Sequence, residues 1–429
     1  MKTNKIIAPL ITGVLFAAAA STYADVNITA TGSTAFRNIA VDAIKKLYDG
    51  GSPSSVGNAK DAAYGICYFG TMSNAIPSLG ATVVQFHATF SGSAQGATDL
   101  YDHNLIGVTY SDGDHSGTNG AVEPSLAPDL AFTDNWPAAM ATPIANSKYD
   151  DNGLDVIGVN VFDFVANRNL ISAGLTNITR ETAKLLLTTS GNQDGTSAGM
   201  PANYIGGSNT NLIWLFGRDI GSGTRITTFA TVGFAGQPTQ YAVNSSGQYV
   251  LASDIAGQVF AISGNGITVG STAFVKTNTT LGSPANGYAL DGFDSGGNLV
   301  TVLNQATNVI GYAGLPDSIS SGNGYQSGSP NLLTFQGVAP SPANVESGAY
   351  PFWSYEHLLS VGNVNGDANK QLVKASLLGT IASSNFQYTD ANYYNNGSNP
   401  QAARLAYMQV QRSVDGGPIT TVAGSIYGF

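Results

Sequence analysis

The sequence VNITATGSTAFRNIAVDAIKKL at residues 26–47 decides the predicted fold. A β-rich run at 26–30 leads into the turn Gly32-Ser33-Thr34, and apolar residues then recur at helical spacing between Phe36 and Leu47. The order strand, turn, helix is the unit from which α/β sheets are wound. We therefore expect an α/β protein that begins with this unit.

The same order of elements recurs further along the chain. A β-rich run at 81–87 precedes a Gly-Ser turn at 91–93 and the start of a helix at 97–105. A stretch rich in Gly, Asp, Asn and Pro at 111–128 indicates an excursion loop, and a strand at 129–134 follows it.

The second half of the chain continues this pattern. An almost continuous β-branched and apolar run at 155–166 is typical of a buried parallel strand. Thr179, with Thr182 three residues later, predicts a helix N-terminus with an imperfect capping box. A strand at 211–216 precedes a Gly-rich loop at 217–224, and another helix is expected to follow.

Between residues 233 and 290 the pattern changes to short strands separated by turn signals, such as Asn244-Ser245-Ser246-Gly247. Helix and strand signals return at 298–303 and 310–314. We predict a hairpin-rich insertion at about 233–290.

The N-terminus has the pattern of a secretory signal peptide at residues 1–24. Lys2 and Lys5 precede an apolar run at 6–20, which is shorter than the roughly 20 residues that a spanning helix needs. We expect cleavage after Ala24 and a soluble protein in the periplasm or the medium. The only cysteine is Cys67, which excludes an intrachain disulfide and disfavours a lipid anchor at the new N-terminus. We expect Cys67 to be a buried, inert thiol.

Size and charge restrict the class of protein. A mature chain of about 400 residues exceeds the length at which a single core stops growing, so two domains are expected. The formal charge is −10, and loss of Lys2 and Lys5 leaves 15 basic against 27 acidic residues, or −12. So acidic a surface disfavours nucleic acid as a partner. A small anion is compatible with it, because backbone dipoles and one arginine can hold an anion locally.

Three segments place a Gly-Ser turn directly before a helix, at 32–35, 92–96 and 221–224. Such turns direct unpaired backbone N–H groups and hydroxyls at one point, where the helix N-terminus adds partial positive charge. One such turn is commonly only a helix cap. Three of them together with Arg218 predict a binding site for an anion.

These segments resemble periplasmic phosphate-binding proteins of phosphate ABC transporters. The resemblance rests on ITATGSTAF at 28–36, TFSGSAQG at 89–96, PDLAFTD at 128–134 and FGRDIGSGTR at 216–225, in that order. Further similar segments are LTNITRETAKLLLTTSG at 175–191, IGYAGLPD at 310–317 and YPFWSYEHLL at 350–359.

The resemblance implies an α/β, two-lobed type II periplasmic binding protein fold. Lobe I would comprise 25–140 and 340–429, and lobe II would comprise 141–339 with the hairpin-rich insertion. It also implies a set of ligand contacts: Thr34, the Ala35 N–H, Ser93, Arg218, Ser222, Gly223 and Thr224. The implied ligand is phosphate or a similar oxyanion, and the implied partner is a membrane permease of an ABC transporter.

An aspartate that accepts the ligand's proton is also implied, and two residues compete for this role. Asp134 follows a predicted strand, and strand ends face the cleft in open α/β folds. Asp112 lies in the loop after the second turn. We favour Asp134. The chain departs from the family at Ile220, where an acidic residue commonly pairs with the cleft arginine, and at Ala35, where an aromatic residue is common.

A catalytic function lacks a motif, because none of His87, His103, His115 and His357 lies in a recognised acyl-transfer pattern. We expect no enzyme activity, no cofactor, no metal and a monomer. The alternative function is an extracellular or surface protein that reuses the binding fold for scavenging, adhesion or assembly.

Overall fold

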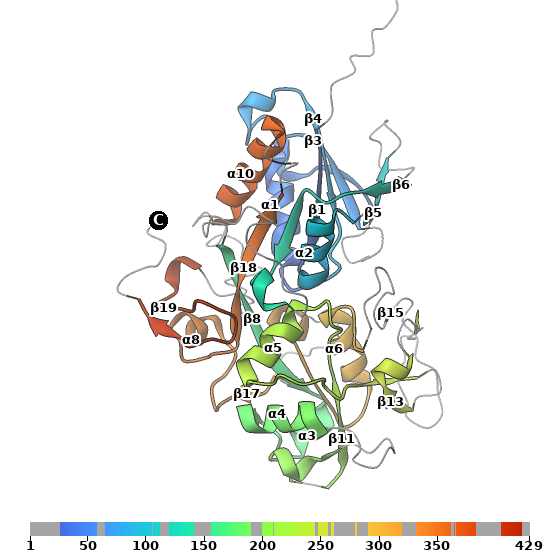
Figure 1. The fold of residues 1–429 in the computed structure, drawn as a ribbon, viewed down its shortest axis with the longest axis vertical. Helices are drawn as coiled ribbons and strands as arrows, with labels where there is room; N and C mark the ends of the chain where they lie inside the picture. The colour runs from blue at the N-terminus through green and yellow to red at the C-terminus, as the bar shows by residue number, and fades with distance from the viewer. Residues whose placement is uncertain are drawn as a thin grey trace, which may run out of the picture.

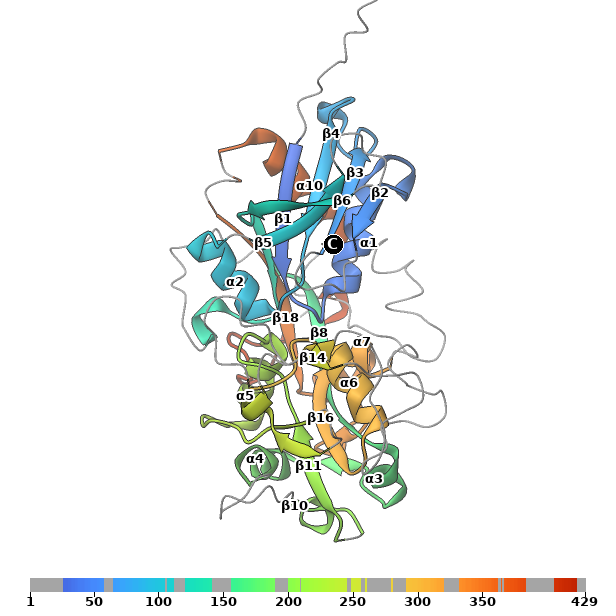
Figure 2. The ribbon, with the colours of Figure 1, turned by 90° about the vertical axis from the view of Figure 1, so that its right-hand side faces the viewer.

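Figures 1 and 2 show an elongated molecule with an upper and a lower lobe, and with strands β8 (Val156–Ala166) and β18 (Trp353–Ser360) running between them. The signal peptide predicted at 1–24 lies outside the residues that this computed structural model describes. The described residues are 26–57, 65–104, 106–111, 120–140, 156–189, 200–208, 210–244, 248–255, 259–260, 279–280, 291–319, 332–361, 364, 366–382 and 405–422.

One ten-stranded sheet runs through both lobes in the order β10-β11-β16-β8-β18-β7-β1-β4-β3-β2. Strands β1 and β4 are parallel, as are β1 and β7, so their carboxyl ends lie side by side. The α/β class predicted from the sequence is confirmed. Besides β8 and β18, the strands of the ten-stranded sheet are β1 (Val26–Gly32), β2 (Ser54–Gly57), β3 (Ile66–Thr71), β4 (Val83–Ala88), β7 (Leu130–Thr133), β10 (Met200–Pro201), β11 (Leu212–Phe216) and β16 (Val309–Gly314).

Helices cover the sheet in both lobes (Figure 1). The upper lobe contains α1 (Arg37–Leu47), α2 (Ser93–Asp102) and α10 (Ala368–Ala382). The lower lobe contains α3 (Arg168–Ser172), α4 (Arg180–Thr189), α5 (Gly223–Val232), α6 (Gly296–Gln305) and α7 (Leu315–Ser318), and α8 (Pro342–Glu346) lies beside the crossing strands.

Five two-stranded sheets complete the described elements. They are β5 (Ile106–Ser111) with β6 (Gly120–Leu126), β9 (Asn177–Ile178) with β17 (Thr334–Phe335), β12 (Tyr241–Val243) with β13 (Tyr249–Leu251), β14 (Val259–Phe260) with β15 (Thr279–Thr280), and β19 (Val410–Gln411) with β20 (Thr420–Thr421).

The two crossing strands join the lobes by changing partners along their length. Strand β8 pairs with β18 through Val156 to Val161 and then with β16 through Phe162 to Ala166. Strand β18 pairs with β7 at its end. Every residue of both strands is buried, which explains the almost continuous apolar sequence. The pairing of β8 is antiparallel throughout, so the expectation of a parallel strand was wrong.

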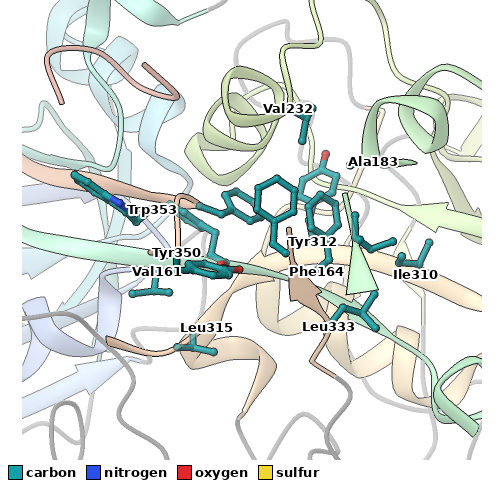
Figure 3. Close-up of a cluster of buried hydrophobic side chains, with 14 of the residues drawn as sticks. Val161, Phe164, Ala183, Val232, Ile310, Tyr312, Leu315, Leu333, Tyr350 and Trp353 are labelled. Carbon is teal, nitrogen blue, oxygen red and sulfur yellow. The ribbon is translucent and has the colours of Figure 1, made fainter. Parts of the chain in front are cut away.

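Aromatic side chains fill the core where the crossing strands enter the lower lobe. Figure 3 shows Phe164 of β8 beside Tyr312 of β16, with Tyr350 from the segment before β18 and Trp353 from its first position. The rings of Phe164 and Tyr312 meet edge to face at 6.4 Å between centroids, and the Tyr350 hydroxyl donates to the Phe162 carbonyl at 2.7 Å. This packing fixes the crossing strands against the lower sheet.

Two local predictions need correction, and one is confirmed. Residues 120–126 form β6 and not a loop, and α2 begins at Ser93, four residues before the predicted start. At the start of α4, the Thr182 N–H donates to Thr179 Oγ1 at 3.2 Å, and the Thr179 N–H donates to Thr182 Oγ1 at 2.8 Å. This reciprocal pair is the predicted capping box, with threonine in place of glutamate.

The described part of the insertion contains short antiparallel pairs, as its turn signals predict. The domain boundaries near 140 and 339 stay a prediction, because residues 141–155 lie outside the described ranges.

Cys67 is buried, and burial raises its pKa to about 12, so the expectation of an inert thiol is confirmed. Within the described residues, no helix has the length and apolarity that crossing a membrane requires.

Asp163 on β8 makes the stability of the protein depend on pH. It is fully buried, accepts a 2.7 Å hydrogen bond from the Ser318 hydroxyl, and has a pKa that burial raises to about 8. Between roughly pH 4 and pH 8 the folded state keeps a proton that the unfolded state has lost, so this carboxyl lowers stability by about 1.4 kcal/mol per pH unit of increase.

Asp163→Asn is therefore expected to flatten the dependence of the free energy of unfolding on pH. Urea unfolding at pH 5, 6, 7 and 8 measures the slope. The matched control is Asp102→Asn on the exposed end of α2, which should keep the wild-type slope. Equal slopes in the wild type and in Asp163→Asn would show that Asp163 is already ionised in the folded state.

Candidate functional site

The three Gly-Ser turns predicted from the sequence meet at the junction of the lobes. The Gly92 N–H donates to the Gly32 carbonyl at 2.8 Å, which joins the first two turns. The N–H groups of Ala94 and Gln95 donate to the Gly221 carbonyl at 3.1 and 3.2 Å, which joins the second turn to the third. The upper and lower lobes therefore touch through the residues that begin α2 and α5.

Two glycines make this close approach possible. Gly32 has φ +120°, and a Cβ there would lie 1.9 Å from the Phe132 carbonyl oxygen. Gly92 has φ +121°, and a Cβ there would lie 2.8 Å from the Gly221 carbonyl oxygen. Both the backbone conformation and the space exclude a side chain, which is why the turns need glycine at these positions.

Arg218 spans the junction. Its side chain is 1% exposed, its Nη2 donates to Thr34 Oγ1 of the upper lobe at 3.2 Å, and its Nη1 donates to Thr224 Oγ1 of the lower lobe at 3.3 Å. One guanidinium therefore lies within hydrogen-bond distance of a hydroxyl from each lobe.

Backbone carbonyls orient Arg218 in place of the acidic partner that the sequence lacks at Ile220. Arg218 Nε donates to the Phe293 carbonyl at 3.0 Å, and its Nη2 donates to the Asp294 carbonyl at 2.8 Å. Arg225 supports the same region, because its Nη1 donates to the Arg218 carbonyl at 3.1 Å and forms an ion pair with Asp291. The Arg218 charge also acts on the buried carboxyls of Asp219 and Asp294, whose pKa values it lowers against the larger, opposite effect of burial.

Asp134 lies in the loop after β7 and is 1% exposed. Its N–H donates to Ser93 Oγ at 3.3 Å, and its Oδ1 is buried without a hydrogen-bond partner in the described structure. Burial raises the pKa of this carboxyl to about 6, against the opposing effects of the Ser93 hydroxyl and the Arg218 charge. A buried acceptor without a partner is costly, so this atom is suited to a ligand that donates a proton.

Helix α5 directs its N-terminus at the same carboxyl. Ser222 caps the helix, with its Oγ accepting from the Arg225 N–H at 3.4 Å. A Cβ on Gly223 would lie 1.5 Å from Asp134 Oδ1 and 2.3 Å from Asn135 Oδ1, so this position has room only for glycine. Ala35 is buried and lies against Gly314 of the lower lobe, where a Cβ would be 3.3 Å from Ala35 Cβ.

The structure thus brings the eight residues that the sequence predicted for the site to one junction. Asp112, the alternative to Asp134, lies outside the described residues, so its role stays a prediction. Sequence reasoning missed three contributors. The carbonyls at 293–294 orient Arg218, and Arg37 begins α1 with a buried guanidinium whose pKa is lowered by burial, with the Arg218 charge acting in the same direction.

Glu356 of β18 is the third contributor. It is fully buried, accepts a hydrogen bond from Asn160 of β8, and has a pKa held well above its usual range by burial and by the Asp134 charge. A glutamate inside the apolar run 350–359 was the signal that could have revealed it. Together these groups offer an anion two hydroxyls, a guanidinium and helix N-termini, beside a carboxyl that can accept a proton.

Among the residues that the structure describes, no group of three or more His, Cys, Asp and Glu side chains is placed to hold a metal ion. The fold and this site define a class: a two-lobed α/β protein with helix N-termini and an arginine at the junction of its lobes.

Comparison with known proteins adds structural similarity at low identity. No family model matches the sequence, and no curated protein matches it. An ABC-type phosphate transport receptor from Vibrio cholerae is 15% identical, with 82% of this chain and 93% of that chain covered and a TM-score of 0.40.

PstS from Borrelia burgdorferi is 13% identical, with 84% and 94% covered and a TM-score of 0.37. A phosphate-binding protein from Stenotrophomonas maltophilia is 14% identical, with 83% and 84% covered and a TM-score of 0.37. At these values the similarity concerns the fold and not the ligand.

Proposed function

We propose that this chain captures phosphate, or a closely similar tetrahedral oxyanion, at the junction of its lobes without changing it chemically. The observation that carries the proposal is a buried guanidinium at the same junction as a buried carboxylate oxygen that has no hydrogen-bond partner among the described residues. Arg218 donates to hydroxyls of both lobes, while Asp134 Oδ1 accepts from no donor in the part of the chain that the structure describes.

Hydrogenphosphate fits this pairing because it carries both charge and a proton. Its oxygens accept from the guanidinium, from the hydroxyls of Thr34 and Thr224, and from N–H groups at helix N-termini. Its P–OH group donates to an ionised Asp134. Sulfate has no proton at neutral pH, so it would leave the carboxylate unpaired and repelled.

Calorimetric titration of refolded, ligand-free protein tests the proposal. Phosphate and arsenate, which both carry a proton at neutral pH, should bind with similar affinities, whereas sulfate and molybdate should bind more weakly. Absence of binding for all four anions would overturn the proposed function.

We also propose that the chain acts outside the cytoplasm as a monomer and delivers its ligand to the permease of an ABC transporter. The signal-peptide pattern at 1–24 supports export. A deletion strain should then show impaired phosphate uptake. Normal uptake, together with the protein only in the medium or surface layer, would favour a scavenging or adhesive role.

A further inference from the structure

The last described residues form a hairpin that returns to the junction of the lobes. This C-terminal hairpin comprises residues 408–422 and contains β19 and β20. Figure 1 shows β19 beside the crossing strands, away from the tip of either lobe. It therefore lies close to the elements about which the lobes would move.

Arg412 anchors the hairpin to the segment that enters β18. Its Nη1 donates to the Trp353 carbonyl and its Nη2 to the Pro351 carbonyl, both at 2.8 Å. The guanidinium carbon also lies 4.0 Å from the centroid of the Trp353 ring. The side chain is 5% exposed, so these are desolvated contacts that hold the base of the hairpin in one position.

The tip of the hairpin contacts both lobes. Asp415 Oδ2 accepts a 2.9 Å hydrogen bond from the Trp136 N–H, in the upper-lobe loop that carries Asp134. The next residue, Gly416, has φ +62° and packs so closely on Ala230 of α5 that a Cβ would lie 2.3 Å from the Ala230 carbonyl carbon. Helix α5 belongs to the lower lobe and begins at Gly223 in the candidate site.

Each contact of the tip therefore falls on an element that carries a proposed ligand residue. The same two elements also touch each other directly, because Asn135 Nδ2 donates to Thr227 Oγ1 at 2.8 Å. Movement of the lobes apart would separate the Trp136 loop from α5, and the hairpin tip would then lose one of its two partners. A contact that exists only in the closed arrangement stabilises that arrangement relative to the open one.

We propose that the C-terminal hairpin holds the two lobes closed around the bound anion, with Asp415 as the positioning residue for the loop that carries Asp134. This inference rests on the proposed function and adds a determinant of ligand release to it. Because the contact is made after closure, it slows dissociation and leaves the association rate nearly unchanged.

Asp415→Ala tests the inference in the full-length protein. Removing the acceptor of the part-buried Trp136 N–H should raise the phosphate dissociation rate roughly tenfold. Stopped-flow measurement of tryptophan fluorescence should resolve this rate, since Trp136 and Trp353 both lie at the contacts. Asp415→Asn keeps an acceptor for the Trp136 N–H and should restore the dissociation rate to within about threefold of the wild type.

Val414→Ser is the matched control, because Val414 is 52% exposed and precedes the contact residue. Phosphate should dissociate from Val414→Ser at the wild-type rate. An unchanged dissociation rate in folded Asp415→Ala would overturn the inference, and so would equal rates in Asp415→Ala and Asp415→Asn. If Asp415→Ala does not fold, Gly416→Ala supplies the second variant, and its dissociation rate must rise for the inference to stand.

Failure of the proposed function is distinguishable from failure of this inference. If wild-type protein binds none of the oxyanions, small-angle X-ray scattering of the ligand-free proteins still tests the hairpin. Asp415→Ala should then show a larger radius of gyration than both the wild type and Val414→Ser. Equal radii in all three would contradict a hairpin that holds the lobes together.

Discussion

Replacement of Arg218 by alanine is expected to weaken phosphate binding by about 2–5 kcal/mol, which corresponds to roughly 30-fold to several thousand-fold in the dissociation constant. The guanidinium is 1% exposed and lies within hydrogen-bond distance of hydroxyls in both lobes. Its removal takes away a desolvated, charge-assisted contact to the ligand and leaves Asp134 facing the anion without a nearby compensating charge. Isothermal titration calorimetry measures the loss.

Two further variants define the cause of that loss. Arg218→Lys should recover only part of the affinity, because an ammonium cannot make the planar two-pronged contact. Arg168→Ala, which removes an exposed arginine at the start of α3, should bind phosphate as the wild type does. Wild-type affinity in folded Arg218→Ala would show that the anion does not bind at this junction.

The core of the site was predictable because its determinants are local in sequence. Each Gly-Ser turn is followed at once by the helix that it starts, so short motifs specify both the turn and the direction of its N–H groups. The meeting of the turns at one junction follows from the parallel pairing of β1 with β4 and from the crossing strands.

The orientation of Arg218 was not predictable in this way. Its carbonyl partners at Phe293 and Asp294 are 75 and 76 residues further along the chain, after the insertion. Carbonyl acceptors carry no sequence signature, because every residue has one. The absence of an acidic residue at Ile220 therefore indicated only that another acceptor was needed, and gave no information on its position.

Strand β6 was missed for a different physical reason. Its sequence contains Pro124, and the surrounding residues are rich in turn formers, so the pattern indicated a loop. Among the described strands β6 pairs with β5 alone, and the register is irregular between Ile106 and Val108, opposite Pro124. An edge strand with a bulge tolerates a proline that a central strand would exclude.

Replacement of Asp134 by asparagine is expected to change the selectivity of the site more than its affinity. In the wild type, an ionised Asp134 accepts the proton of hydrogenphosphate and repels sulfate. Asparagine has nearly the same size but can also donate, so the variant should bind sulfate better and lose preference for phosphate by about 100-fold. Competition of sulfate against labelled phosphate at constant ionic strength measures this ratio.

The pH dependence of the same competition separates a carboxyl effect from a change of shape. The pKa of Asp134 is raised by burial to about 6, so the wild type carries a neutral carboxyl below that pH and an ionised one above it. Sulfate should therefore compete better in the wild type as the pH falls through this range, whereas Asp134→Asn should lack this contribution.

The control variant Asp112→Asn should leave the ratio of sulfate to phosphate binding at its wild-type value. If Asp112→Asn changes selectivity and Asp134→Asn does not, the proton acceptor is Asp112. If neither substitution matters, the site does not discriminate phosphate from sulfate by its proton, and another oxyanion becomes the better ligand.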